Sequence, residues 1–593
     1  MLLHLKSKSI VISMLTGCLF QFGFTSLLGI TLFLSCQSPQ KADLILINGK
    51  VFTYTWDDPA GDGSPAANAP YVDGVLQPDA EAVAIRDSKI IFVGSAAKAL
   101  TLKSENTEIV DVGGGTILPG LVDSHTHVAE LGAKLTRVDL TDVESEQQAV
   151  ALVAGHAKSV PAGDWIIAQG WDEGAWAQNY PDKNLLTEKV PRHPVLMRSL
   201  HGFAVWCNQM ALDRAGIDSN TETPVGGEIH KNAAGQPNGL FLNRATTLLD
   251  AAVPPPTQAQ IKQMLLAGLK EMARSGYAAV HEAGVDSQHL AAYQALQDEG
   301  KLPIRVYVML SARDESLIRE WTTRGPWRSD DNMLFVQSVK AYYDGALGSR
   351  GARLLEPYSD QPGHFGVSGD GYGFDQDLVA DIMQAGFQVG IHAIGDAGNR
   401  ETLDFFEKAL SRHSKLQQNR HRIEHAQVVH PADFSRFRQM EIIASMEPPH
   451  AVEDKSWAEE RLGPQRIKGA YAWRTFREAG VPLIFNSDLS GSDHNIFYGL
   501  HSAITRRDKN LQPPAGWYTE QTMTPEEAVR GYSSWAAYAS FLENETGTIE
   551  IGKWADLTVL DLDPHETGVH APDDLLNGNA ILTIVSGKIV YGE

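Results

Sequence analysis

Short apolar runs in the middle of the chain alternate with segments whose apolar residues recur at helical spacing. The runs predict strands at residues 121–127, 277–283, 303–310, 338–345, 388–396, 421–427, 441–449 and 482–488. Helical patterns such as QIKQMLLAGLKEMARSG and RETLDFFEKALSRHSK separate them. Strands that alternate with helices form a parallel sheet, and eight such units close into a barrel. The pattern therefore predicts an α/β fold, a TIM-like (β/α)₈ barrel over residues 119–546.

One stretch, at about residues 140–270, interrupts this alternation. It contains DWIIAQGWDEGAW, HPVLMRSLHGFAVWCNQMAL and GGEIHKNAAGQPNGLF. Because it follows the first barrel strand, we expect an insertion on the catalytic face, where such loops shape the substrate pocket.

Both ends of the folded chain alternate apolar and polar residues with a period of two. Residues 42–118 contain ADLILINGKVFTYT, EAVAIRDSKIIFVG and ENTEIVDVGGGTILPG, and residues 547–593 contain GTIEIGKWADLTVLDLDP and AILTIVSGKIVYGE. Period-two alternation between glycine turns is typical of short strands. Two strand-rich ends around an α/β centre predict one discontinuous, small β-sandwich, built from both termini, that braces the barrel.

Residues 1–36 predict a targeting segment. Lys6 and Lys8 precede a run without charge that ends at Cys36, and the polar QSPQKAD follows. This resembles a bacterial lipoprotein signal with lipid attached to Cys36. Cys18 fits the usual lipobox better by letter, but cleavage there would leave the apolar LFQFGFTSLLGITLFL on the mature protein. An uncleaved anchor is the alternative, since about 20 apolar residues span a bilayer. Each reading places the catalytic body in the cell envelope, facing the periplasm or exterior.

The composition is that of a soluble globular enzyme, with 43% hydrophobic and 21% charged residues. A formal net charge of −23 disfavours binding of nucleic acid or anionic lipid, so membrane contact is expected through the N-terminal segment only. Outside that segment Cys207 is the one cysteine of the sequence. A single thiol builds neither a disulfide framework nor a cysteine metal cluster, and we expect Cys207 to be buried.

Metal-capable residues fall at the ends of the predicted strands. His125 and His127 close the first strand, His392 lies in the fifth, His425 in the sixth, and Asp488 ends the eighth. Residues i and i+2 of a strand point to the same face, so the first two imidazoles can bind one ion. The His-x-His spacing alone has little weight in a chain with 20 histidines. Their common position at strand ends predicts one metal site at the barrel rim.

Lys340, in the fourth predicted strand, has two interpretations. A protonated lysine cannot bind a cation, so a metal role requires a neutral amine or a carbamate formed with carbon dioxide, whose two oxygens would bridge two ions. The alternative is a buried lysine that pairs with Asp344.

Polar and aromatic residues near these strand ends are candidates for orienting a substrate. For each candidate, the alternative is a packing role or a surface ion pair. His281 and Glu282 are two further polar residues, which we expect either to support the site or to act in it directly. The candidates are Trp171, His201, Tyr343, Arg350 and His450.

The motifs LPGLVDSHTHV, VKAYYDGALGSRGA, IHAIGDAGN, RIEHAQ and NSD, followed by GTIEIGKWADLTVLD, resemble the amidohydrolase superfamily. They are most similar to its amidohydrolase family 3 branch, which includes the N-substituted formamide deformylase-like enzymes. The resemblance covers the chain from about residue 42 to the C-terminus. It implies one or two zinc ions, with Lys340 as a carboxylated bridge in binuclear members. The ligands that it implies are His125, His127, His392, His425 and Asp488.

The insertion motif Gly170-Trp171-Asp172 is also typical of this branch, but two other motifs depart from it. Leu489-Ser490 follows Asp488 where relatives often have a small residue and proline, and Leu200-His201-Gly202 stands where many have Asp-Gly-His. Both departures bear on the substrate pocket.

The resemblance implies a metal-dependent amidohydrolase that cleaves a non-peptide C–N bond, an amide, N-acyl or N-formyl group, in a small molecule. Zinc would activate the attacking water, and Asp488 would act as ligand and general base. The alternatives are an ester or carbamate hydrolase that uses the same site, and a catalytically inactive binding protein of the envelope.

The lipid-anchor hypothesis has a direct test. Cells that express the full chain and are labelled with palmitate should incorporate label, and Cys36→Ser should abolish it because the acceptor thiol is lost. Cys18→Ser is the control and should keep the label. Label lost with Cys18→Ser alone would move the processing site to that residue.

Overall fold

The computed structural model describes residues 41–592, apart from 142, 173–179 and 201. Cys18, Cys36 and His201 therefore lie outside the described residues, and so does the predicted targeting segment. Within the part that is described, no helix combines the length and the apolar character that crossing a membrane requires.

The central sheet contains eight parallel strands, and all eight match the strands predicted from the sequence. Their order is β23-β22-β21-β20-β19-β17-β16-β9, and the short β18 (Trp327–Arg328) pairs antiparallel with β19. The eight strands are β9 (Leu121–Thr126), β16 (Tyr277–Val285), β17 (Arg305–Ser311), β19 (Leu334–Tyr342), β20 (Gln388–Ala393), β21 (Arg422–His425), β22 (Ile443–Met446) and β23 (Leu483–Phe485).

Backbone contacts between the carboxyl end of β9 and the segment just after β23 close this sheet into a barrel. Thr126 and Leu489 form a parallel bridge, the Asp488 N–H donates to the His125 carbonyl at 3.1 Å, and the His127 N–H donates to the Leu489 carbonyl at 2.8 Å. The first and last strands thus meet where the predicted metal ligands of both strands lie.

Helices connect the barrel strands. The principal ones are α2 (Val128–Thr136), α7 (Gln258–Arg274), α8 (Ser287–Asp298), α9 (Glu315–Arg324), α10 (Gly369–Tyr372), α11 (Gln376–Gln384), α12 (Asp396–Arg412), α13 (Phe434–Met440), α14 (Pro448–Asp454), α15 (Ala458–Arg466), α16 (Trp473–Glu478), α17 (Ile496–Thr505), α18 (Pro525–Gly531) and α19 (Ser534–Ala539).

The contact between α2 and α7 shows how the sequence specifies this packing. Thr257 and Gln260 form a capping box that starts α7. A Cβ at Gly132 would lie 1.8 Å from the Met264 carbonyl oxygen, and one at Gly268 would lie 2.5 Å from the Val128 carbonyl oxygen. Glycine at these two positions allows the helix backbones to approach closely, beside the loop that carries His127.

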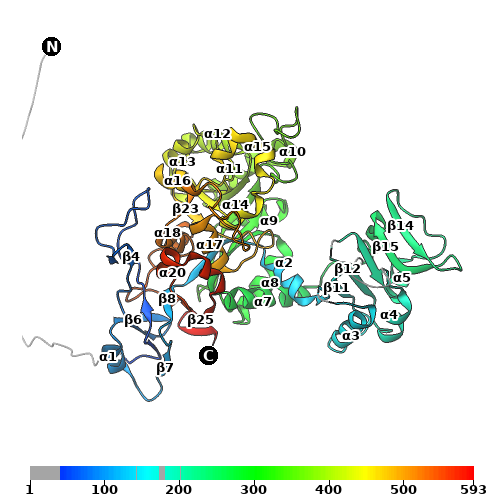
Figure 1. Cartoon of the computed structure of the whole chain (residues 1–593), viewed down its shortest axis with the longest axis horizontal. Helices are drawn as coiled ribbons and strands as arrows, with labels where there is room; N and C mark the ends of the chain where they lie inside the picture. The colour runs from blue at the N-terminus through cyan, green and yellow to red at the C-terminus, as the bar shows by residue number, and fades with distance from the viewer. Residues whose placement is uncertain (1–40, 142, 173–179, 201, 593) are drawn as a thin grey trace, which may run out of the picture. The chain divides into compact units, whose positions relative to one another are not determined.

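Strands from both ends of the chain form the predicted β-sandwich, and their blue and red ribbons run side by side in Figure 1. One sheet has the order β6-β5-β1-β7 and the other β2-β8-β24-β25-β26, with β24 antiparallel to β8. The strands are β1 (Leu44–Ile47), β2 (Lys50–Val51), β5 (Ala82–Arg86), β6 (Lys89–Gly94), β7 (Glu108–Asp111), β8 (Thr116–Pro119), β24 (Leu557–Leu560), β25 (Ala580–Val585) and β26 (Lys588–Tyr591). Buried apolar residues of both ends, among them Leu46, Ile117 and Ile584, form one core.

The segment after β9 contains a six-stranded mixed sheet of order β10-β11-β12-β13-β15-β14 with apolar clusters of its own. Cys207 is buried in it, as expected. Its elements are β10 (Val138–Asp139), β11 (Ile166–Trp171), β12 (Val195–Ser199), β13 (Ala204–Cys207), β14 (Gly227–Lys231), β15 (Pro237–Asn243), α3 (Glu146–His156), α4 (Lys183–Lys189) and α5 (Gln209–Ala215).

A buried ion pair joins the barrel to the sandwich. Arg305, at the start of β17, donates from Nε and Nη2 to the two carboxylate oxygens of Asp556 at 2.7 and 2.8 Å. Asp556 also accepts from the Ser586 N–H at 2.9 Å, and the Arg305 guanidinium stacks on Trp554. Both charged groups are buried, so each depends on the other for compensation.

Replacing Asp556 with Ala should therefore destabilise the protein by about 3–5 kcal/mol, because an unpaired guanidinium stays buried. Urea unfolding of the purified protein measures this change. Glu188→Ala, which removes an exposed carboxylate from a helix, is the control and should leave the midpoint unchanged. Equal midpoints for the two variants would contradict the structural role of the pair.

Candidate metal centre

The predicted metal ligands meet at one rim of the barrel. Each lies at, or a few residues beyond, the carboxyl end of a parallel strand, and these ends share one side of a barrel. Their strands are β9 for His125 and His127, β19 for Lys340, β20 for His392, β21 for His425, and β23 for Asp488.

His125, His127 and Asp488 form a compact group of donors. The Asp488 Oδ1 lies 3.3 Å from the His127 Nε2 and 3.7 Å from the His125 Nε2. Two donors of one tetrahedral zinc ion lie roughly 3.4 Å apart, so this spacing fits a single cation.

Buried charged residues fix the orientation of His125. Its Nδ1 lies 2.6 Å from the Glu424 Oε2, and the Glu424 Oε1 lies 2.8 Å from the Arg422 Nε. The Arg422 Nη1 in turn lies 2.9 Å from the His281 Nδ1. With Nδ1 bonded to a carboxylate, the imidazole presents Nε2 to the centre, as metal-binding histidines do.

The charge states at this position suit a cation. Burial and the nearby Lys340 lower the pKa of His125 to about 4, so the imidazole is neutral at pH 7. Burial alone would raise the pKa of Glu424, but the Arg422 guanidinium and His125 hold it well below its usual value. Neutral imidazole and ionised carboxylate are the forms that bind or orient at a metal.

Asp488 is likewise ionised. Its burial would raise the pKa of the carboxyl, but the hydrogen bond with His127 and the nearby imidazoles of His125 and His425 hold that pKa well below the usual value. The backbone at Asp488 has φ of 47°, a left-handed conformation, and its N–H also donates to the Asn486 Oδ1 at 3.0 Å. The chain thus turns the carboxylate toward the histidines of β9.

Lys340 points to the same group. Its Nζ lies 3.0 Å from the His125 Nε2, and burial lowers the pKa of the amine. Asp344 accepts instead from the backbone N–H groups of residues 353, 394 and 395, at 2.8 to 2.9 Å. Of the two interpretations of Lys340, the contacts therefore favour the one that brings it to the candidate metal centre.

His392 and His425 lie beside one another, with ring centroids 4.5 Å apart. Among the described residues, the buried His392 Nε2 and His425 Nδ1 have no hydrogen-bond partner, although Asp344 Oδ1 lies 3.5 Å from the first and Glu447 Oε2 lies 3.2 Å from the second. Buried polar nitrogens without partners are costly. Unpaired imidazoles among carboxylates fit a cation that takes nitrogen and oxygen ligands, such as zinc.

Two residues of the VHEAG segment support this centre. Glu282 accepts from the Val128 N–H at 2.8 Å and from the Thr126 hydroxyl at 3.0 Å, and so anchors the turn that follows His127. His281 contacts Arg422. Both therefore act through neighbouring residues.

Of the predicted substrate-orienting residues, His450 lies in the centre, with its Nε2 4.0 Å from the Asp488 Oδ2. Trp171 is buried in the core of the inserted sheet and donates to the Met197 carbonyl at 2.9 Å. The Tyr343 hydroxyl donates to Glu401 at 2.6 Å, and Arg350 pairs with Asp360 at 2.7 Å. These three residues make the packing and surface contacts that the sequence left as alternatives, and a substrate role for them stays a prediction.

Glu424 and Glu447 were not among the residues singled out from the sequence. Arg422 and Glu424 are two residues apart, so strand alternation places both inside the barrel. The same alternation would turn His425 outward. His425 instead has φ of 73°, and this local turn brings its side chain to the rim. In the sequence, the i, i+2 spacing of Arg422 and Glu424 was the signal that could have identified Glu424 as a residue of the barrel interior.

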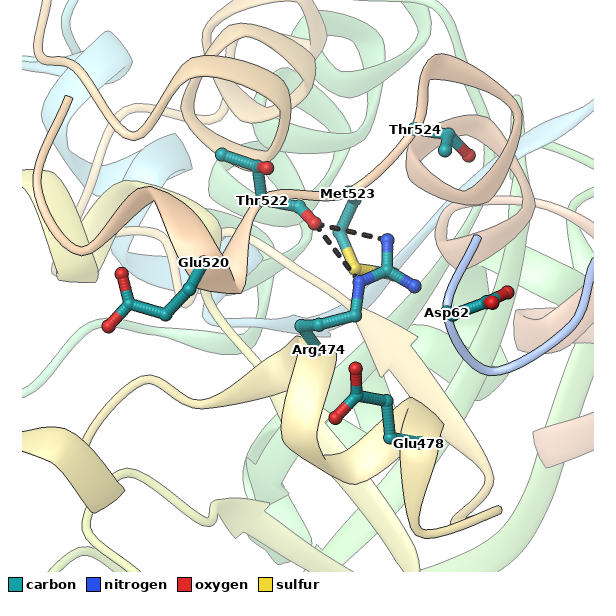
Figure 2. Close-up of a pocket in the computed structure, with 7 residues that line it drawn as sticks. All are labelled: Asp62, Arg474, Glu478, Glu520, Thr522, Met523 and Thr524. Carbon is teal, nitrogen blue, oxygen red and sulfur yellow. Dashed lines mark hydrogen bonds between the residues drawn. The ribbon is translucent and has the colours of Figure 1, made fainter. Parts of the chain in front are cut away.

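A separate pocket of about 340 Å³ shares no residue with this rim. Its lining consists of Asp62, Arg474, Glu478, Glu520, Thr522, Met523 and Thr524, shown in Figure 2. Arg474 donates to the Thr522 carbonyl, as the dashed lines show, and pairs with the buried Glu527. The guanidinium thus holds neighbouring loops together.

Comparison with known proteins identifies the class. The chain matches the sequence profile of the amidohydrolase family over residues 108–591 and belongs to that family. Its fold is that of this family's metal-dependent hydrolases, as the resemblance implied.

Two relatives and one solved structure illustrate the similarity to this family. The chain is 30% identical to the putative amidohydrolase YtcJ of Bacillus subtilis (strain 168), over 86% of this chain and 96% of that one. It is 25% identical to an N-substituted formamide deformylase of Arthrobacter pascens, over 86% and 95%. An uncharacterized metal-dependent hydrolase from Pyrococcus furiosus shares the fold, with a TM-score of 0.66, 24% identity and coverage of 88% and 99%.

Glu424→Gln should weaken zinc binding about 10- to 100-fold, because the side chain that orients His125 loses its charge. Competition with a chelator of known affinity measures the zinc dissociation constant, and circular dichroism verifies folding. Asp404→Asn, an exposed partner of Arg436, is the matched control and should bind zinc like the wild type. Equal affinity of Glu424→Gln and wild type would contradict the orienting role.

Proposed function

We propose that the protein is an amidohydrolase that cleaves a non-peptide C–N bond of a small molecule, an amide, N-acyl or N-formyl group, with a zinc-activated water. The observation that carries the proposal is the convergence of His125, His127 and Asp488 at tetrahedral donor spacing on the rim of this family's barrel. The name of the Arthrobacter pascens relative, a formamide deformylase, supports the bond class.

The ligand set proposed for zinc comprises imidazole nitrogens and one carboxylate, which suit this ion. A bound zinc would supply hydroxide at neutral pH by lowering the pKa of water to about 7. The proposed ligands are His125, His127, His392, His425 and Asp488, with Lys340 as a carboxylated bridge if two ions bind. Burial favours the neutral Lys340 amine, which is the form that combines with carbon dioxide.

Asp488 would handle the proton of the reaction. Its carboxylate is ionised and lies beside the β9 histidines, so it can accept the proton of the attacking water. The same oxygen can then deliver the proton to the departing nitrogen, which leaves as an amine. Glu424 and Arg422 keep His125 in place during both steps.

A location in the cell envelope is part of this proposal and rests on the N-terminal sequence alone. A lipid or an uncleaved anchor at that end would leave residues 42–593 to act on small molecules outside the cytoplasm.

The experiment is a screen of N-formyl and N-acyl amines, each with the matching ester, on zinc-loaded protein. Amide hydrolysis is expected, and Asp488→Asn should lower kcat about 10²- to 10⁴-fold while the protein keeps most of its zinc, because the proton acceptor is lost. Asp493→Asn is the control, since Asp493 pairs with Lys509, and should keep full activity.

Each other outcome has a definite meaning. Turnover of the esters alone would overturn the bond class, and unchanged activity of Asp488→Asn would overturn the role of that residue. Zinc binding without turnover of any compound would favour the inactive binding protein.

A further inference from the structure

An exposed arginine lies at the rim of the barrel, outside the groups described so far. Arg313 follows β17 by two residues, so it lies at the carboxyl ends of the strands, on the side of the candidate metal centre. Its guanidinium carbon lies 4.0 Å from the ring centroid of Tyr342 and 5.5 Å from that of Tyr372. These cation–π contacts hold a long, flexible side chain in place.

Tyr342 connects this arginine with the candidate metal centre. It ends β19 two residues after Lys340, so strand alternation turns both side chains to the same face. The ring centroid of Tyr342 lies 5.2 Å from the Lys340 Nζ and 5.9 Å from the ring centroid of His392. One aromatic ring therefore borders the Arg313 guanidinium as well as two proposed metal ligands.

The Arg313 guanidinium has no ionic partner within the described part of the chain, and no hydrogen-bond acceptor there. Two neighbouring carboxylates act as helix caps instead. Asp314, the N-cap of α9, accepts from the Leu317 N–H at 3.2 Å, and Asp375, the N-cap of α11, accepts from the Leu378 N–H at 2.9 Å. The stacked guanidinium thus keeps its hydrogen-bond donors for a group that the protein itself does not supply.

The hydroxyl of Tyr342 offers a second donor beside this arginine. A Cβ at Gly284, near the carboxyl end of β16, would lie 3.0 Å from the hydroxyl, so the missing side chain leaves room for it. Among residues 41–592, as far as they are described, no group forms a hydrogen bond with this hydroxyl. A phenol and a guanidinium both donate, and together they suit an oxygen acceptor.

The charges around the ring suit an anion of single charge. Burial and the carboxylates of Asp488 and Glu130 raise the pKa of the Tyr342 hydroxyl, and the Arg313 guanidinium opposes this rise. A dianionic phosphate would meet these two carboxylates with one arginine to balance it. A carboxylate carries one negative charge, and its two oxygens match the fork of the guanidinium.

We propose that Arg313, held on the ring of Tyr342, binds a carboxylate of the substrate, so that the protein selects small amides with an acid group close to the scissile bond. The Tyr342 hydroxyl is the second donor to this carboxylate. The inference rests on the proposed function and narrows its substrate class. N-acyl and N-formyl amino acids are the simplest such compounds, and their hydrolysis by one water releases an amino acid and a carboxylic acid.

The test compares each amino-acid derivative with the matching alcohol, in which CH₂OH replaces the carboxylate. Racemic N-formyl and N-acetyl derivatives of alanine and phenylalanine vary the acyl group and the size. On the zinc-loaded full chain, kcat/KM for the acid should exceed that for the alcohol about 10- to 100-fold, mainly through KM, because a charged hydrogen bond is gained. Arg313→Met keeps the stacking side chain without its charge and should bring the ratio to about one.

Arg324→Met is the matched control. Arg324 is also exposed and lies over two aromatic rings, 4.5 Å from Trp321 and 5.6 Å from Trp327, but it ends α9, toward the amino ends of the strands. This variant should keep the wild-type ratio. Arg313→Lys, which retains the charge without the fork, should keep part of the preference. Tyr342→Phe retains the ring and should lower the ratio less than Arg313→Met does.

A binding measurement separates recognition from catalysis. In ketone analogues of the same compounds, CH₂ replaces the scissile N–H, so there is no C–N bond to cleave. By titration calorimetry, the wild type should bind the acid analogue about 10- to 100-fold more tightly than the alcohol analogue. Arg313→Met should bind both with equal affinity, and circular dichroism verifies that it is folded.

Each other result overturns a definite statement. A wild type that hydrolyses and binds the alcohols as well as the acids would overturn this inference alone, and so would equal ratios for wild type and Arg313→Met. A wild type that binds the acid analogues through Arg313 but hydrolyses no amide would overturn the proposed function alone. Neither binding nor hydrolysis of any of these compounds would overturn both.

Discussion

The candidate site depends on the way the barrel closes. Hydrogen bonds between the backbones of His125, His127, Asp488 and Leu489 join the carboxyl end of β9 to the segment just after β23. The same few residues carry side chains of the candidate metal centre. Closing the sheet and assembling the donors are therefore one structural event, and a chain whose barrel stayed open at this seam would not bring Asp488 to the histidines.

Charges inside the barrel are tolerated because each has a partner. Arg422 is buried with Glu424, and Glu424 with His125, so that a line of hydrogen-bonded groups runs from the barrel interior to the rim. Breaking one member of such a line leaves an uncompensated charge in a medium of low polarity. The arrangement gives the site its rigidity, since an imidazole with one nitrogen bonded to a carboxylate has a fixed direction for the other nitrogen.

The surroundings of Asp488 connect the proposed chemistry with the fold. One oxygen faces the β9 histidines and the other faces His450, and Glu447 stands behind His425 and His450 as Glu424 stands behind His125. This repeated use of a carboxylate behind imidazoles gives the rim two similar halves. A family of hydrolases with such a rim can vary its substrates through the loops above it while the metal chemistry stays the same.

The sequence by itself determined the barrel, because apolar runs separated by helical patterns are set by local periodicity, and all eight strands appear where that periodicity places them. It also singled out His125, His127, His392, His425 and Asp488, since residues at strand ends meet on one rim whatever the details of packing. Only the tertiary structure decided which neighbours orient them. His425 reaches the rim through its local turn, Glu447 stands behind it just before α14, and His450, which follows β22, approaches Asp488, which follows the neighbouring β23. Contacts of that kind depend on side-chain directions at irregular strand ends, where neither the strand period of two nor the helical period of about 3.6 residues applies.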